Sequence, residues 1–217
     1  MSNNEKSYGP SPQIHIYQTS KKLLEFTNKM VIADVDTYGN VHSRGRGGNI
    51  PSRIGLQIQD YSAGTGDANI KLFANIAPSE IAYLLMLVQR GDKDINFVQQ
   101  KIIAAKTNNE GRAPVTKLEI IRADKDKNGN ERRLKWFIRI TNGSGSPKKS
   151  TTGGIQCAPG SFTKEKEAFI NLSDEDMFKA LHEVQTFIEL WQMVNAIPVI
   201  KEAQKQLAEF YSKRQAI

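Results

Sequence analysis

The sequence predicts an α+β fold in which antiparallel sheets pack with helices. One observation is that several stretches alternate apolar and polar residues with period two, which is typical of half-buried strands. The other is that residues 71–88 align without gaps to residues 167–184, so that Phe73 matches Phe169 and Asn75 matches Asn171. Each stretch is a short strand that leads directly into a helix. We therefore expect two ββββα repeats forming two antiparallel sheets packed with helices, plus a C-terminal helix.

The first repeat, at about residues 13–91, is predicted to contain four strands and one helix. The strands are expected near residues 13–18, 29–36, 53–61 and 69–76, and the helix at 79–90. Pro78 marks the helix start, because a proline at the opening position removes an N–H that has no partner there.

The second repeat, at about residues 92–195, is predicted to have the same order of elements. Its strands are expected near residues 95–104, 115–123, 133–142 and 165–172, with a helix at 174–195. Ser173 and Asp176 form a Ser-x-x-Asp capping box at the start of that helix. Residues 142–161 are rich in Gly, Ser, Thr and Pro and are predicted to be a mobile loop.

An apolar seam runs along the predicted helix at 174–195. Seam residues with this spacing pack either on the helix's own sheet or on a helix of another copy of the chain: Met177, Leu181, Val184, Ile188 and Trp191. Pro198 is expected to separate this helix from a final one at about 198–214. Residues 1–12 are expected to form a disordered arm, which leaves 13–214 as a single domain.

The segment 122–136 places four residues at the first, third, fifth and sixth positions of a calcium-binding loop: Asp124, Asp126, Asn128 and Gly129. Such a loop also needs a bidentate carboxylate at its twelfth position, and that position is Lys135. Asn-Gly between two strand-like runs is instead a strong hairpin signal. We therefore predict a hairpin and no metal site.

The positive charge of the chain is concentrated around this hairpin. The 217 residues carry a net charge of +7, and residues 111–150 contain 11 basic and 4 acidic side chains, which accounts for the whole excess. Such a cluster indicates a surface that faces a polyanion rather than an ordinary solvated face. The single cysteine, Cys157, fits a reducing cytoplasm, and no apolar run is long enough to span a membrane.

A duplicated ββββα unit with a basic, alternating sheet resembles the Whirly family and the related positive transcription cofactor 4 fold, over about residues 13–214. The resemblance implies a single-stranded DNA-binding protein that assembles into homo-oligomers through its helices. Plant members carry a Lys-Gly-Lys-Ala-Ala-Leu stretch. Its nearest match here, Lys71-Leu72-Phe73-Ala74, keeps one lysine and one alanine and loses the glycine, which suggests a bacterial or mobile-element relative.

Binding of single strands without sequence preference needs aromatic rings for stacking and cations for phosphates. Strand alternation puts Lys135, Phe137 and Arg139 on one face, whereas Phe73 and Phe137 could each pack in the core instead. The candidate nucleic-acid-binding residues are Arg44, Arg46, Arg53, Gln57, Gln59, Tyr61, Lys71, Phe73, Arg122, Arg132, Arg133, Lys135, Phe137 and Arg139.

These observations predict a non-enzymatic, largely sequence-independent single-stranded DNA-binding protein without a cofactor, acting in replication, recombination or DNA transfer. An RNA-binding protein of the same fold is the first alternative. A metal-dependent nuclease using Asp34 and Asp36 is the second, and a scaffolding protein that binds no nucleic acid is the third.

Overall fold

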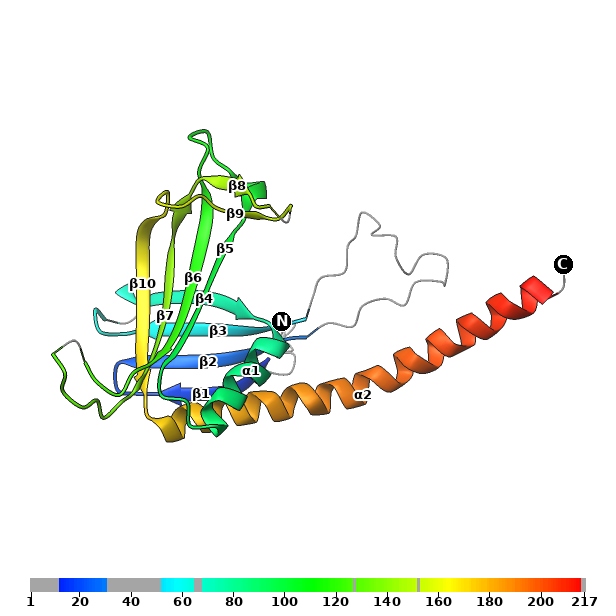
Figure 1. The fold of residues 1–217 in the computed structure, drawn as a ribbon, viewed down its shortest axis with the longest axis horizontal. Coiled ribbons are helices and arrows are strands. Elements are labelled where there is room, and N and C mark those ends of the chain that lie inside the picture. Colours follow the sequence, from blue (N-terminus) through cyan, green and yellow to red (C-terminus); the bar gives the residue numbers. More distant parts are fainter. Residues whose placement is uncertain (1–11, 31–51, 65–67, 127, 152, 216–217) are drawn as a thin grey trace, which may run out of the picture.

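Two four-stranded antiparallel sheets form the body of the fold (Figure 1). The computed structural model describes residues 12–30, 52–64, 68–126, 128–151 and 153–215. Sheet A has the order β1-β2-β3-β4 and contains β1 (Gln13–Gln18), β2 (Lys22–Lys29), β3 (Arg53–Asp60) and β4 (Ile70–Ile76). Sheet B has the order β10-β7-β6-β5 and contains β5 (Ile95–Ile102), β6 (Ala113–Arg122), β7 (Trp136–Gly145) and β10 (Thr163–Leu172). A small hairpin joins β8 (Pro147–Lys149) to β9 (Ile155–Cys157).

A helix follows each sheet. Helix α1 (Pro78–Gln89) has Pro78 in its first turn, as predicted, and the Glu80 carboxylate accepts a hydrogen bond from Ala77 N–H at 2.6 Å. Helix α2 (Asp174–Gln215) begins with the predicted capping box, because Asp176 N–H donates to Ser173 Oγ at 3.1 Å. The α+β class with antiparallel sheets and a C-terminal helix is confirmed. Across the described part of the chain, no helix is both long and apolar enough to cross a membrane.

The two sheets and the two helices share one hydrophobic core. The strands of sheet B run across those of sheet A (Figure 1), and β10 contacts β3 and β4. The face of each sheet that contributes to this core is called the inner face here, and the opposite face the outer face. On β7, Trp136, Ile138 and Ile140 are buried on the inner face, as the alternation predicted.

The second strand lies elsewhere than predicted. The structure places β2 at Lys22–Lys29 rather than at 29–36, and residues 31–51 lie outside the described part of the chain. A tight turn follows β1, where Lys22 N–H donates to Thr19 Oγ1 at 2.9 Å and Thr19 N–H donates to the Lys22 carbonyl at 2.8 Å. This turn contains no glycine, proline or asparagine, and therefore gave no turn signal.

The C-terminal region also differs from the prediction. Residues 174–215 form one continuous helix that includes Pro198 and bends along its length (Figure 1). A proline removes one backbone hydrogen bond and bends a helix, but here it does not end it. The apolar seam up to Ile188 packs on the protein's own core, with Trp191 partly buried against it.

The predicted loop at 142–161 contains regular structure. Strand β7 continues to Gly145, and β8 and β9 follow it. The Arg112 guanidinium holds this region from both ends, because it donates to the carbonyl oxygens of Ser144 at 2.8 Å and Ser161 at 2.9 Å.

The hairpin at residues 122–136 is confirmed. Strands β6 and β7 pair antiparallel up to Arg122 opposite Trp136, and Lys125 bridges Glu131 beyond them. Gly129 has a φ of 83°, and Asp126 N–H donates to the Asn130 carbonyl at 2.9 Å. A glycine with positive φ at the end of a short loop closes the hairpin without strain.

Candidate nucleic-acid interface

The outer face of sheet A carries a row of three side chains across neighbouring strands. Glu25 on β2 lies opposite Gln57 on β3, and Gln57 lies opposite Phe73 on β4. Gln57 Nε2 donates to a Glu25 carboxylate oxygen at 3.0 Å. Phe73 has no such partner and is 49% exposed, so it lies outside the core.

Sheet B carries a row of the same kind on its outer face. Glu119 on β6 lies opposite Arg139 on β7, which lies opposite Phe169 on the edge strand β10. Arg139 Nε donates to Glu119 Oε2 at 2.7 Å. Both rows therefore run from a carboxylate, through a hydrogen-bond donor, to a phenylalanine at the strand farthest from the carboxylate.

The aromatic end of the second row is a pair of rings. The ring centres of Phe137 and Phe169 are 5.3 Å apart with an angle of 36° between the planes, and Phe169 is 38% exposed. Phe137 is half-buried on the outer face and is not part of the core. The alternative that Phe73 or Phe137 packs in the core is therefore excluded.

Each of these rings has a cation close to it. Lys71 Nζ lies 6.0 Å from the ring centre of Phe73, and the Arg139 guanidinium carbon lies 5.3 Å from that of Phe137. Lys22 Nζ lies 3.5 Å from the ring centre of Phe169 and also contacts Asp60 at 2.9 Å, so Lys22 joins sheet A to the edge of sheet B. Cations at such distances are attracted to aromatic faces.

A buried carboxylate, that of Glu119, partly neutralises the positive charge on the outer face of sheet B. Glu119 is 5% exposed and receives Lys117 Nζ at 2.9 Å in addition to Arg139. Burial alone would raise the pKa of Glu119, but hydrogen bonds from Arg139 and Lys117 outweigh it and hold this pKa below its usual range. The face thus carries two cations around one ionised carboxylate.

The predicted residues of β3 and its surroundings lie together on sheet A. Gln57 and Gln59 are on the outer face of β3, and the Tyr61 hydroxyl donates to Gln59 Oε1 at 2.9 Å just beyond the strand. Lys71 lies opposite Gln59 and is exposed. Arg53 is at the other end of β3, opposite Lys29.

Two further predicted cations form ion pairs within the protein, as Arg139 does, but among the described residues neither of them lies beside an aromatic ring. The Arg122 guanidinium contacts both carboxylate oxygens of Asp174, at 2.8 and 3.0 Å, and Asp124 at 3.1 Å. Trp136 Nε1 donates to the same Asp174 at 2.8 Å. Lys135 Nζ contacts Asp124 at 3.1 Å. We therefore leave Arg122 and Lys135 out of the candidate interface.

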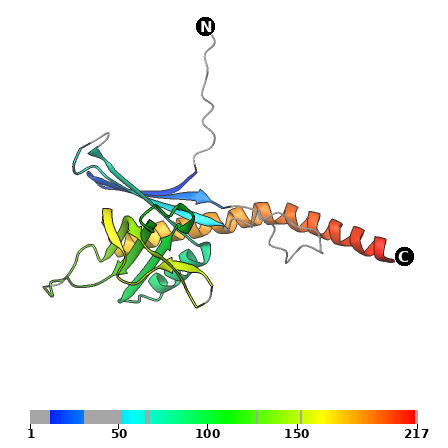
Figure 2. The same cartoon turned by 90° about the horizontal axis from the view of Figure 1, so that it is seen from above.

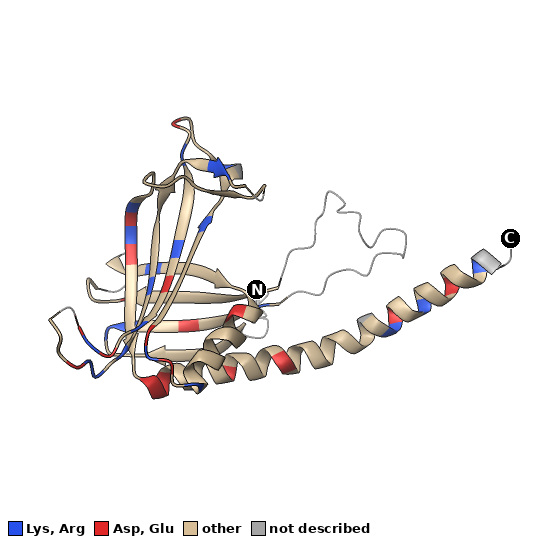
Figure 3. Ribbon diagram, viewed as in Figure 1, with Lys and Arg blue, Asp and Glu red and all other residues tan. Residues whose placement is uncertain are grey.

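The two remaining predicted interface residues of the hairpin, Arg132 and Arg133, lie on different sides. Arg132 Nη2 donates to Asn171 Oδ1 at 3.3 Å, and Asn171 lies opposite Phe137 on the outer face of sheet B. Arg133 is exposed and acts electrostatically on Tyr17, a residue of β1 that packs against the core. The structure therefore brings Arg132, but not Arg133, to the aromatic pair. Figure 3 shows that acidic and basic residues are mixed along this connection and along β10.

Four residues named from the sequence lie outside the described part of the chain, namely Arg44, Arg46, Asp34 and Asp36. The structure also adds three residues to the candidate interface that sequence reasoning missed: Lys117, Glu119 and Phe169. The alignment of Phe73 with Phe169 contained the signal for the last of these. Comparisons with family models, with curated proteins and with solved structures found no match to this chain.

Proposed function

We propose that this protein binds single-stranded nucleic acid, preferably DNA, on the outer faces of its two sheets and without catalysis. The observation that carries the proposal is that each outer face presents an exposed phenylalanine beside a cation, Phe73 with Lys71 and Phe169 with Phe137 and Arg139. Exposed rings on a polar sheet face cost free energy by contact with water, and a ligand that covers them removes this cost.

Single strands fit this arrangement better than a duplex. Unpaired bases offer flat π faces that stack on aromatic side chains for about 1–3 kcal/mol per base, whereas the faces of paired bases are covered by their neighbours in the stack. Cations beside the rings would neutralise the phosphates of the same nucleotides. Because stacking does not read base edges, we propose that binding is largely independent of the DNA sequence. Such binding would serve replication, recombination or DNA transfer, in which single strands of any sequence are exposed.

We further propose that the two sheets are copies of one ββββα unit, in a Whirly-like arrangement. The matching rows support this, since Glu25, Gln57 and Phe73 occupy the same relative positions as Glu119, Arg139 and Phe169. The extra hairpin of β8 and β9 would then be an insertion in the second unit.

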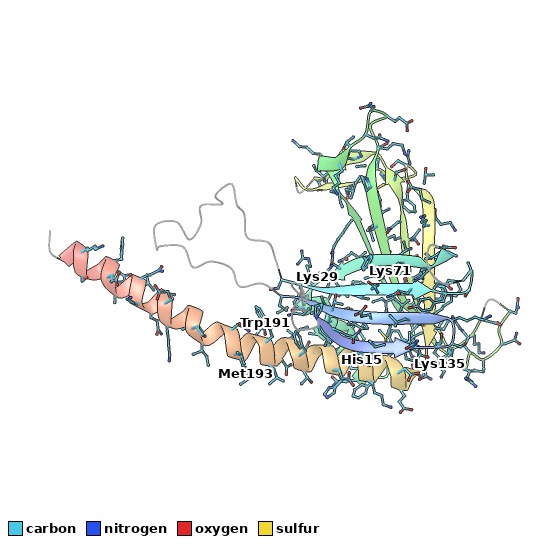
Figure 4. All side chains as sticks on the ribbon, turned by 180° about the vertical axis from the view of Figure 1, so that it is seen from behind. His15, Lys29, Lys71, Lys135, Trp191 and Met193 are labelled. Carbon is cyan, nitrogen blue, oxygen red and sulfur yellow. The ribbon has the colours of Figure 1, made fainter. Side chains whose placement is uncertain are left out.

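We propose that the protein forms a homo-oligomer through the distal part of α2, by which we mean residues 190–215. This part extends away from both sheets (Figures 1 and 2), and Met193 and Trp191 mark where it leaves the body (Figure 4). Four of its apolar side chains are more than half exposed and spaced 3-4-3 along one helix face: Leu190, Met193, Ile197 and Ile200. Such a stripe is stabilised by a second helix, for which we propose the same helix of another copy.

A competition experiment tests the proposed function. A fluorescent 30-nucleotide oligothymidine is bound at low salt and displaced by unlabelled DNA of the same length, by its duplex with oligoadenine, or by oligouridine. We expect single-stranded DNA to displace the probe at lower concentration than the duplex. If the duplex competes equally well, or if the probe does not bind, the proposal is wrong. If oligouridine competes better than DNA, the ligand is RNA.

A further inference from the structure

Two lysines from different sheets converge on one asparagine at an end of sheet A. Lys29 Nζ, at the end of β2, donates to Asn75 Oδ1 at 2.8 Å. Lys101 Nζ, on β5 of sheet B, donates to the backbone carbonyl of the same Asn75 at 2.7 Å. The same residue thus accepts a hydrogen bond from each lysine, one on its side-chain oxygen and one on its backbone carbonyl, and within the described ranges its Nδ2 makes no hydrogen bond.

A third cation joins this end of the sheet. Arg53 lies directly opposite Lys29 on the neighbouring strand, and like charges in directly opposite positions repel and destabilise a sheet. Arg53 also repels Lys101: burial, followed by the charge of Arg53, lowers the pKa of Lys101, and only the more weakly acting Glu80 opposes them. Three cations therefore lie at this end of sheet A, and Arg53 repels both of the lysines that contact Asn75.

No acidic side chain of the described residues forms a salt bridge with Lys29, Arg53 or Lys101. The carboxylate that acts on Lys101, Glu80, is hydrogen-bonded to Ala77 N–H and Gln99 Nε2. This contrasts with the outer face of sheet B, where Glu119 lies between its two cations.

A glycine on the neighbouring strand leaves room for the Lys29 side chain to reach Asn75. Gly55, which lies opposite Asn75 on β3, has no side chain, and a Cβ atom added there would lie 2.9 Å from Lys29 Cε and would also collide with Thr27 Oγ1. The Lys29 side chain thus lies flat over Gly55 on its way to Asn75. A larger residue at position 55 would displace the Lys29 side chain from Asn75.

Figure 4 shows Lys29 and Lys71 at separate places along sheet A. The cluster at Asn75 is therefore distinct from the pair of Lys71 and Phe73.

We propose that Lys29, Arg53, Lys101 and the Asn75 amide form a binding site for a phosphate group. The inference rests on the proposed function for its ligand, a backbone phosphate of the bound strand. Phe73 and Asn75 are both on the outer face of β4, about 7 Å apart along the strand. A base on Phe73 therefore has its phosphate within reach of the cluster, which makes the site the anchor of a nucleotide on sheet A.

The first experiment measures the affinity for a 30-nucleotide oligothymidine as a function of salt concentration. Lys29→Gln combined with Lys101→Gln should make the log–log slope shallower by about 0.7 units, since the proposed site neutralises one phosphate and each neutralised phosphate contributes about 0.7 on single strands. Lys201→Gln combined with Lys205→Gln makes the same change in net charge on the distal part of α2, and should leave the slope unchanged. Gly55→Ala alters no charge and should also weaken binding, because it displaces Lys29.

The second experiment uses inorganic phosphate as the probe and needs no nucleic acid. Phosphate at constant ionic strength should raise the melting temperature of the wild type relative to chloride, since a ligand of the folded state stabilises it. It should raise that of Lys29→Gln/Lys101→Gln less, because only the general stabilising effect of phosphate on folded proteins remains there. Circular dichroism and the melting temperature in chloride establish that each variant is folded.

The two experiments separate this inference from the proposed function. If the wild type binds oligothymidine and a folded double variant keeps the same slope and affinity, the phosphate site is refuted while the function stands. If the wild type binds no oligothymidine at low salt, the function is refuted, and the phosphate experiment alone decides the site. An equal rise of the melting temperature in phosphate for the wild type and for the double variant would then refute the site too.

Discussion

Arg139 Nε lies 2.7 Å from Glu119 Oε2 in the middle of the outer face of sheet B. Together with Lys117 at 2.9 Å, Arg139 lowers the pKa of Glu119 against the opposing effect of burial. A carboxyl group whose pKa is lower in the folded state stabilises the fold at pH values above its unfolded-state pKa. This contribution is lost as the pH falls through the folded-state pKa.

We therefore expect Glu119→Gln to lower the free energy of unfolding at pH 7 by about 1–3 kcal/mol, because Arg139 and Lys117 lose their charged partner. The loss should shrink when unfolding is measured at pH 3, because the unfolded-state carboxyl of the wild type is then largely protonated. Glu25→Gln is the matched control, since Glu25 occupies the equivalent position but contacts the neutral amides of Gln57 and Gln13. An equal loss at both pH values would contradict the account.

The Asp174 carboxylate ties the start of α2 to sheet B, through Arg122 and the Trp136 indole. Replacing it with asparagine should destabilise the protein by about 1–3 kcal/mol, because the three hydrogen bonds that the carboxylate accepts, two from Arg122 and one from Trp136, are weakened. Since Arg122 is outside the candidate interface, the salt dependence of oligothymidine binding should not change. Urea unfolding and a salt titration on the same preparation test both expectations, and a shallower slope would return Arg122 to the interface.

Arg132 and Lys135 are two cations of the same connection with different surroundings. Arg132 reaches Asn171 beside the aromatic pair, whereas Lys135 contacts Asp124. Arg132→Gln should therefore make the salt slope of single-strand binding shallower by about 0.7, and Lys135→Gln should leave it nearly unchanged. The opposite result would mean that the nucleic acid follows the Lys135 side of the hairpin.

The apolar stripe on the distal part of α2 predicts a dependence of assembly on Met193, which is 65% exposed. Met193→Asp should shift the mass measured by light scattering towards that of the monomer, because a charge buried between two helices is costly. Gln192→Asp introduces the same charge at the preceding, polar position and should preserve the wild-type mass. A monomeric wild type at micromolar concentration would refute the proposed oligomer.

Local patterns predicted those elements whose signals lie within a few residues. The alternation on β7, the capping box at Ser173 and the glycine of the β6–β7 hairpin all have local causes, and the structure confirms each. The β1–β2 turn was missed because the Thr19 hydroxyl, rather than a glycine, stabilises it. The break expected at Pro198 was wrong because a single lost hydrogen bond does not stop a long helix.

The candidate interface could be predicted only in part, for a related reason. Alternation assigns Phe137 and Arg139 to one face, but it does not reveal which residue lies opposite them on another strand. That Glu119 lies opposite Arg139, and that Lys101 reaches Asn75 from the other sheet, depends on strand register and on how the sheets cross. The sequence therefore indicated an excess of positive charge but not which cations are already paired.

The central claim is that the exposed phenylalanines of the two sheets stack on bases. The most direct test compares the wild type with the double variant Phe73→Ala/Phe169→Ala in oligothymidine binding over a series of salt concentrations. The two positions belong to different sheets, so their effects should be nearly additive, and the loss should reach about 2–6 kcal/mol. The salt slope should stay the same, because neither ring neutralises a phosphate. A double variant that is folded and binds with wild-type affinity would contradict the account.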